Sequence, residues 1–134
     1  ALMAGAVDFM ATAAEIAGEK LGTPTDGISF LPTLLGKNAQ QKEHDYLYWE
    51  FYEQGSKQAL RAGKWKAVRR PMHTGPIELY DISIDIGEKN DVAAQHPEVL
   101  SGFERIFTNA HTPNKRWRSS GKPRNREREQ SEGR

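Results

Sequence analysis

The stretch that decides the fold runs from Tyr46 to Val68 and reads YLYWEFYEQGSKQALRAGKWKAV. In its first part Leu47, Trp49 and Phe51 alternate with tyrosines and a glutamate, the period-two pattern of a strand with two different faces. A glycine then interrupts the stretch twice, as the tight reversals of an antiparallel meander require. The pattern predicts three short strands, with Leu47, Trp49 and Phe51 facing the core.

The residues that follow predict the rest of this sheet and its cover. Ile77 to Tyr80 reads as a fourth strand after a reversal rich in proline and glycine. Pro97 occupies a first helical position, and the residues after it carry an apolar stripe at helical spacing. The stripe consists of Val99, Leu100, Phe103, Ile106, Phe107 and Ala110. We predict an α+β fold, a four-stranded antiparallel sheet packed against this C-terminal helix. Its shared core consists of Leu47, Trp49, Phe51, Leu79, Phe103, Ile106 and Phe107.

The chain before the sheet predicts helical segments. Between Met3 and Leu21, small and apolar residues recur at three-four spacing, and Gly18 is a natural helix end. This face, which includes Met3, Val7 and Met10, is expected to pack against the sheet or against a second copy of the chain. A shorter helix, with the Ser29 side chain as its cap, is expected to run through Leu31, Leu34 and Leu35 to Gly36.

Composition excludes several classes of function. The sequence has 134 residues with 19 basic and 18 acidic side chains, so the net charge gives no reason to expect nucleic acid or a membrane as partner. It contains no cysteine, which excludes disulfides, thiolate metal ligands and a cysteine nucleophile. The abrupt start on Ala-Leu-Met-Ala suggests a piece cut from a longer protein.

The residue patterns that could indicate a metal site or a polyanion site are incomplete or interrupted. The four histidines, His44, His73, His96 and His111, are not spaced as a helical zinc pair. A calcium-binding loop counted from Asp81 would need glycine at Ile86 and glutamate at Val92, so the acidic segment from Asp81 to Asp91 is read as a solvated loop. A basic run between Lys115 and Arg128 is interrupted by glutamates, and residues 119–134 are read as a solvated tail.

Four stretches, taken in order, resemble the C-terminal part of the sulfatase family, in particular its bacterial arylsulfatase type. The stretches are Asp8 through Thr12 to Gly18, Asp26 to Gly36, Tyr48 to Phe51 with Gln58 to Lys66, and Glu78 to Asp81 followed by Asp85, Glu88 and Asn90. They are similar to the family's patterns Asp-x-x-Pro-Thr, Asp-Gly-x-Ser-Leu-x-Pro, Arg-x-Gly-x-x-Lys and Glu-Leu-Tyr-Asp. Ala11 and Ile86 depart from the family, which often has proline at both positions.

The resemblance implies three parts. Residues 1–45 are a helical segment left over from, and joining, a missing N-terminal α/β catalytic domain. Residues 46–111 are the C-terminal subdomain, and residues 112–134 are a polar basic tail. In the family, a Cys or Ser within Cys/Ser-x-Pro-x-Arg becomes formylglycine and a calcium ion neutralises the sulfate; neither is expected in this part. The resemblance also implies a periplasmic or secreted protein.

What this part can offer to a sulfate ester substrate is one wall of the pocket. Tyr52, Lys57 and Gln58, in and beside the first turn of the meander, are suited to stack on a ring and to meet an anionic group. No catalytic and no metal-binding residue is predicted. The alternatives are an ordinary polar hairpin tip, a free-standing module that binds a polyanion through its basic tail, or a structural domain that docks through an apolar face.

Overall fold

The computed structural model describes residues 2–114, in two compact units. The first consists of residues 2–47 together with Arg61–Lys64, and the second of residues 48–60 and 65–114. The basic run from Lys115 onward lies outside the described residues. Among the helices of residues 2–114, none is both long and apolar enough to cross a membrane.

The first unit is helical, as predicted. It contains α1 (Asp8–Ala17), the short α2 (Leu31–Leu34) and a 3₁₀ turn, η1 (Asn38–Gln40). α1 ends at Gly18, whose φ of 73° is the left-handed conformation that glycine adopts without strain. The predicted helix start at Met3 is wrong, because the Asp8 side chain accepts a hydrogen bond from the Gly5 backbone N–H at 2.7 Å and the helix begins only at Asp8.

A buried polar network holds this unit together. The two carboxylate oxygens of Asp8 accept hydrogen bonds from the N–H groups of Gly5 and Ile28, at 2.7 and 2.8 Å, and Oδ1 also lies 2.7 Å from Nε2 of His44. The Thr12 hydroxyl accepts the Phe30 N–H at 3.0 Å and donates to the Asp8 carbonyl. The side of α1 that the rest of the unit covers is therefore polar.

The apolar face predicted for α1 is mostly exposed. Met3 is buried, but Val7 is 52% and Met10 61% exposed. Within this unit, Asp8 and Thr12 occupy the covered side of the helix instead. That Val7 and Met10 lie against the sheet or against a second copy of the chain stays a prediction.

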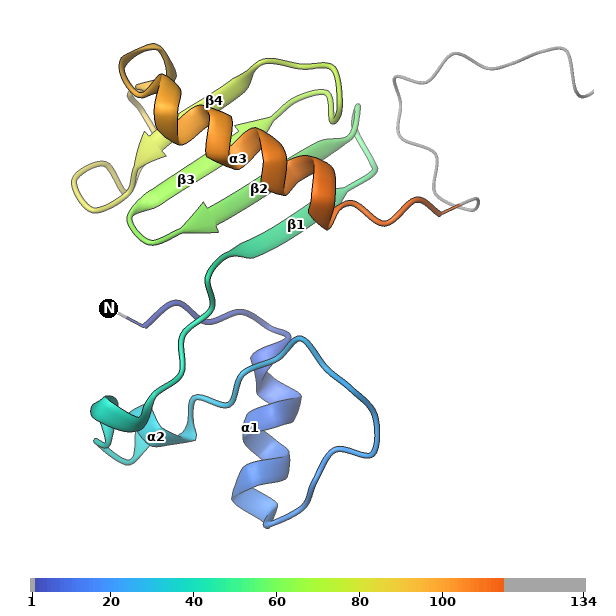
Figure 1. Ribbon diagram of the computed structural model, residues 1–134, viewed down its shortest axis with the longest axis vertical. Helices are drawn as coiled ribbons and strands as arrows, with labels where there is room; N and C mark the ends of the chain where they lie inside the picture. The colour runs from blue at the N-terminus through green and yellow to red at the C-terminus, as the bar shows by residue number, and fades with distance from the viewer. Residues whose placement is uncertain (1, 115–134) are drawn as a thin grey trace, which may run out of the picture. The chain divides into compact units, whose positions relative to one another are not determined.

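The second unit confirms the predicted α+β architecture. Strands β1 (Leu47–Phe51), β2 (Lys57–Ala62), β3 (Trp65–Arg69) and β4 (Ile77–Asp81) form one antiparallel sheet in the order β1-β2-β3-β4. In the β3–β4 pair, Ala67 lies opposite Leu79. The helix α3 (Pro97–Ala110) begins at the predicted proline and crosses one face of the sheet (Figure 1), after the 3₁₀ turn η2 (Ala93–Gln95).

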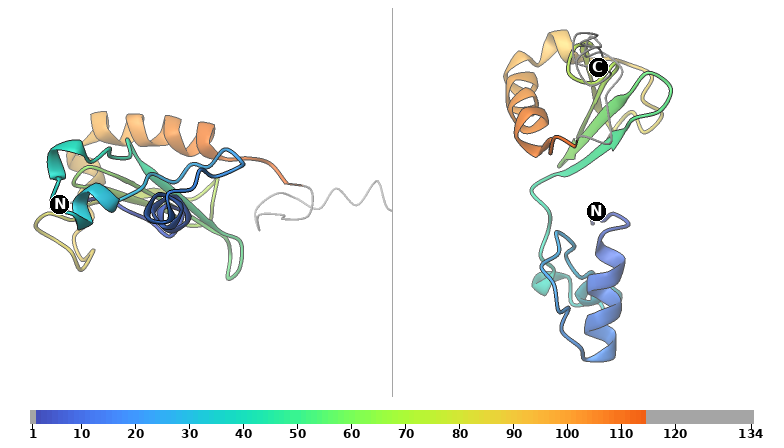
Figure 2. Two further views of the ribbon diagram at one scale, coloured as in Figure 1. Left: turned by 90° about the horizontal axis from the view of Figure 1, so that it is seen from below. Right: turned by 90° about the vertical axis from the view of Figure 1, so that its right-hand side faces the viewer.

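Helix and sheet enclose one core, and Figure 2 shows from two further sides that α3 lies along one face of the sheet. The buried apolar side chains of the second unit are Leu60, Ala67, Met72, Leu79, Tyr80, Phe103 and Phe107. Leu79, Phe103 and Phe107 were predicted core residues and are buried, as is Leu47 in the first unit. The remaining residue of the α3 stripe that was assigned to the core, Ile106, is half-buried.

The predicted core face of β1 is wrong. Trp49 is 45% and Phe51 47% exposed, whereas the ring of Tyr48 meets that of Phe107 edge-on at 6.2 Å. The alternation itself is correct, but the side that carries Glu50 is the one turned toward α3. This side can be covered because Glu50 has hydrogen-bond partners there, and a buried carboxylate with partners is tolerated.

Candidate functional site: a polar cluster at one end of the sheet

A carboxylate lies at the centre of the polar side chains near the end of β1. Glu50 accepts hydrogen bonds from the hydroxyl groups of Tyr48 and Tyr52, one on each oxygen. Its Oε1 also lies 2.6 Å from Nδ1 of His111, the residue at which the chain leaves α3. Strand alternation puts Tyr48, Glu50 and Tyr52 on one face, so the sequence Tyr-x-Glu-x-Tyr builds this arrangement locally.

A buried amide links this cluster to the next turn of the sheet. Gln58, near the start of β2, is only 1% exposed. Its Nε2 donates to the Tyr48 hydroxyl at 2.9 Å, and its Oε1 accepts the backbone N–H of His73 at 3.2 Å. Gln58 thus joins the face of β1 to the β3–β4 turn.

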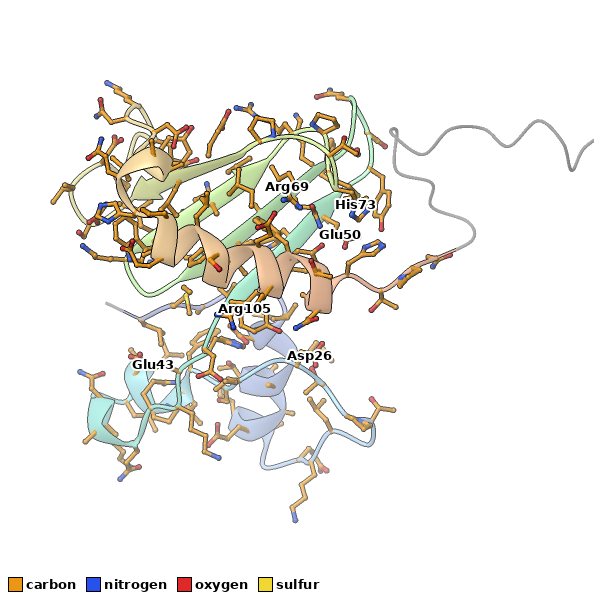
Figure 3. The ribbon with its side chains drawn as sticks, turned by 45° about the horizontal axis from the view of Figure 1, so that its top comes forward. Asp26, Glu43, Glu50, Arg69, His73 and Arg105 are labelled. Carbon is orange, nitrogen blue, oxygen red and sulfur yellow. The ribbon has the colours of Figure 1, made fainter. Side chains whose placement is uncertain are left out.

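Two histidines from distant parts of the chain meet at this end. The rings of His73, in the β3–β4 turn, and His111, after α3, have centroids 4.6 Å apart at an interplanar angle of 70°. Figure 3 shows Glu50, Arg69 and His73 close together beside the last turns of α3. Arg69 donates to Glu104 at 3.1 Å and places its guanidinium 5.7 Å from the centre of the Phe107 ring.

The cluster keeps its carboxylate charged and its phenols neutral. Burial alone would raise the pKa of Glu50, but the hydrogen bonds from Tyr48, Tyr52 and His111 outweigh it and hold this pKa below the usual range. The hydrogen bond to Glu50, followed by burial, raises the pKa of Tyr52 to about 12. Burial first and then Glu50 raise the pKa of Tyr48 as well. Glu50, Tyr48 and Tyr52 are therefore not suited to exchanging protons near neutral pH.

Replacing Glu50 by glutamine is expected to bring the pKa of Tyr52 back toward the usual phenol value of about 10. The hydrogen bond to the charged Glu50 is the largest cause of the raised pKa. A raised phenol pKa stabilises the fold below the unfolded pKa, and this stability is lost as the pH rises through the folded pKa. The variant should therefore lose less stability between about pH 10 and 12. Ring resonances of assigned tyrosines measure the effect. Tyr80 beside Glu78 is the internal control, and a Tyr52 that still titrates at about 12 would contradict the expectation.

The three residues predicted to line a pocket have different surroundings. Tyr52 is half-buried and donates to Glu50. Gln58 is buried within the cluster, so it positions its neighbours from beneath. Lys57 precedes it in β2 and therefore belongs to the opposite face, where its Nζ lies 5.7 Å from the centre of the Phe51 ring. The structure brings Tyr52 and Gln58 into one network and leaves Lys57 outside it.

Glu50, His73 and His111 belong to the cluster but were not predicted as site residues. Glu50 could have been found, because an acid between two tyrosines at period two shares their face. No comparable signal pairs His73 with His111, since they come from a turn and from a helix end. Within residues 2–114, no group of three or more histidines, aspartates and glutamates is arranged to hold a metal ion.

Comparison with known proteins finds relatives among sulfatases. The chain is 30% identical over 122 residues to an N-acetylgalactosamine-6-O-sulfatase of Bacteroides thetaiotaomicron, a match that covers 79% of this chain and 23% of that protein. It is 37% identical over 62 residues to an uncharacterized sulfatase of Schizosaccharomyces pombe, with 45% of this chain and 11% of that protein covered. The chain thus spans less than a quarter of either relative. No protein-family model matches it.

Solved structures give the same partial match. The crystal structure of Ps i-CgsB superimposes with a TM-score of 0.67 at 26% identity, over 82% of this chain and 24% of that one. A protein solved in complex with its substrate D-glucosamine-2-N,6-O-disulfate gives a TM-score of 0.61 over 77% of this chain and 23% of that one. At 19% identity, the second likeness concerns the fold alone.

These matches show that the chain is similar to one α+β part of sulfatases. The resemblance to the C-terminal subdomain of the sulfatases, expected from four sequence motifs, is confirmed.

Proposed function

We propose that the chain is the C-terminal part of a sulfuric ester hydrolase of the arylsulfatase type. It supports the catalytic domain and forms one wall of the substrate pocket with one end of the sheet. This end holds the polar side chains that we call the Glu50 cluster: Tyr48, Glu50, Tyr52, Gln58, His73 and His111. The observation that carries the proposal is the sulfatase match over less than a quarter of the relatives' length. A sulfate ester substrate and a periplasmic or secreted location belong to the proposal.

The chemistry of the reaction is assigned to the rest of that enzyme. Formylglycine and calcium are the groups that the family resemblance implies, and the residues of this chain do not fit them. The sequence has no cysteine, and Ser29-Phe30-Leu31-Pro32-Thr33 has neither the proline spacing nor the arginine of the precursor motif. The carboxylates Asp8 and Glu50 are each committed to hydrogen bonds within the protein. We derive no catalytic step for this chain.

Joining the chain to its upstream coding sequence tests the proposal. The upstream frame is expected to encode Cys/Ser-x-Pro-x-Arg, and the joined protein to hydrolyse an aryl sulfate. Neither half alone should do so, and calcium should not raise the melting temperature of this chain, because a ligand stabilises only a fold that holds its site. Turnover by the purified chain, or a joined protein that is folded but inactive on every sulfate ester tried, would contradict the proposal.

We assign the contact with the missing catalytic domain to the exposed apolar residues of the first unit. Val7, Phe9 and Met10 are each more than half exposed, and a wet apolar surface costs about 25 cal/mol per Å². In the separated chain, a second copy is expected to cover them. Light scattering should then show self-association that a Val7→Glu, Met10→Glu variant loses. If both proteins are monomers of equal stability, this surface needs no cover.

A further inference from the structure

The C-terminal end of α3 carries the most deeply buried side chain of the helix. Phe107, in the last turn, is 1% exposed and meets the ring of Tyr48 edge-on, with the ring centres 6.2 Å apart. The chain leaves the helix at His111, which has an extended conformation with φ −69° and ψ 122°. Helix ends fray because their last carbonyl groups have no partner within the helix. A contact that fixes this end of α3 therefore protects the core of the second unit.

Glu50 and His111 make such a contact between β1 and the end of α3. The two residues are 61 positions apart in the sequence, and Oε1 of Glu50 lies 2.6 Å from Nδ1 of His111. The side chains of Glu50 and His111 are 14% and 20% exposed, so salt and water screen this pair less than a pair on the surface. The contact ties the point where the chain leaves α3 to the first strand of the sheet.

The negative charge of Glu50 strengthens this contact. The hydroxyl groups of Tyr48 and Tyr52 also donate to the carboxylate, and they fix its position for the imidazole of His111. Hydrogen bonds with a charged partner contribute more than hydrogen bonds between neutral groups. A protonated carboxyl loses its charge, and one of its oxygens becomes a donor. The strength of the contact therefore depends on the ionisation of Glu50.

The groups around Glu50 come from several elements of the second unit. Figure 3 shows that Arg69, of β3, and His73, of the β3–β4 turn, lie close to Glu50. The guanidinium of Arg69 is paired with the carboxylate of Glu104 at 3.1 Å. The titratable and charged groups that face Glu50 are therefore Tyr48, Tyr52, Arg69, His73 and His111.

Acid acts against the contact through Glu50. Burial raises the pKa of Glu50, but the hydrogen bonds from the tyrosines and from His111 outweigh burial and hold this pKa below its usual range. A carboxyl group with a lowered pKa contributes stability above its unfolded value, and this stability is lost as the pH falls through the folded value. The contact is therefore closed at neutral pH and weakened in acid.

We propose that Glu50 and His111 form an acid-released latch that clamps the last turn of α3 onto β1. While the latch is closed, Phe107 stays packed on the Tyr48 ring. When it opens, the last turn frays while the sheet and the first turns of α3 stay folded, so the shape of the sheet end that holds the Glu50 cluster changes with pH. The proposal concerns the fold of this chain and does not depend on the proposed function.

The test is amide hydrogen exchange of the full 134-residue chain, followed by NMR from about pH 6 to about pH 3, the range in which carboxyl groups titrate. The protection factors of Thr108, Asn109 and Ala110 are expected to fall about tenfold in acid, because a hydrogen bond to a charged group is lost. Amides of β3, inside the sheet, report global opening and should fall less. If the last turn of α3 loses protection only in step with β3, its end does not open separately and the latch is wrong.

Variants test the latch at neutral pH as well. Glu50→Gln and His111→Ala should each lower the protection of the last turn about tenfold, and the double variant should lower it no further, since both changes remove one contact. Thr112→Ala, at the exposed neighbour of His111, should leave protection unchanged. Glu50→Gln should also abolish the fall in acid, whereas Glu104→Gln, at the carboxylate paired with Arg69, should keep it.

Two results would overturn the latch. One is an additive effect of Glu50→Gln and His111→Ala, because independent effects mean that the two side chains do not act through their contact. The other is a fall of protection in acid that persists in folded Glu50→Gln, because another group would then open the end of α3. Protection of the β3 amides shows which variants are folded. Should Glu50→Gln not fold, unchanged protection of the last turn in His111→Ala overturns the latch by itself.

Discussion

Replacing Phe107 by alanine is expected to lower the free energy of unfolding by about 3–5 kcal/mol, because a fully buried phenylalanine loses both its transfer free energy and its packing. Phe107 is 1% exposed in α3, where its ring contacts the ring of Tyr48 and lies under the guanidinium of Arg69. Urea unfolding of the chain, followed by circular dichroism, measures the change.

Trp49→Ala is the matched control. The sequence pattern assigns Trp49 to the core, whereas the structure leaves it 45% exposed. Its loss should cost about 1 kcal/mol or less, as for other surface positions. Should Trp49→Ala prove more costly than Phe107→Ala, β1 would face the other way and the Glu50 cluster would not exist as described. Phe103, 6% exposed, should behave like Phe107.

Replacing Asp8 by alanine is expected to destabilise the first unit by about 3 kcal/mol, because it leaves several buried hydrogen-bonding groups without a partner. The carboxylate binds the N–H groups of Gly5 and Ile28 and faces His44, and Asp8 itself is 1% exposed. Amide hydrogen exchange at Ile28 and Phe30 isolates the response of this unit. Asp26→Ala, an exposed aspartate of the same unit labelled in Figure 3, is the control.

Lowering the pH should destabilise the first unit through the Asp8 carboxylate. Burial pushes the pKa of Asp8 upward, but the hydrogen bonds from Gly5, Ile28 and His44 outweigh it and hold this pKa below the usual range. A lowered carboxyl pKa gives stability above the unfolded value, and this stability is lost as the pH falls through the folded value. The acid loss of exchange protection at Ile28 should disappear in Asp8→Asn. An unchanged acid profile in that variant would mean that another group is responsible.

The sequence predicted the end of a helix correctly where a single residue with a strong backbone preference stands there. Gly18 ends α1 and Pro97 begins α3, since each has a backbone preference that acts locally. The orientation of β1 could not be predicted in this way, because alternation separates two faces without saying which is covered. Hydrophobicity favoured Trp49 and Phe51, but the hydrogen bonds of Glu50 allow the more polar face to be buried.

The candidate site was predictable only in its local part. Tyr52 and Gln58 were singled out from their place beside a turn, and both belong to the cluster. His73 and His111 could not be added, because their meeting depends on the length of α3 and on how it crosses the sheet. The positive φ of His73 also has no sequence signal, since histidine is not a residue that turns require there.

The position of β1 in the strand order has a consequence for handling the protein. β1 is an end strand, with a strand neighbour within the sheet on one side only. Its outward face carries Trp49 and Phe51, both nearly half exposed. End strands with apolar faces are templates for pairing with strands of other molecules, and natural proteins protect them with charge. On this face the ammonium of Lys57, in β2, lies beside the Phe51 ring. The strand that carries Glu50 on its covered face thus offers strands of other molecules an edge flanked by exposed aromatic rings.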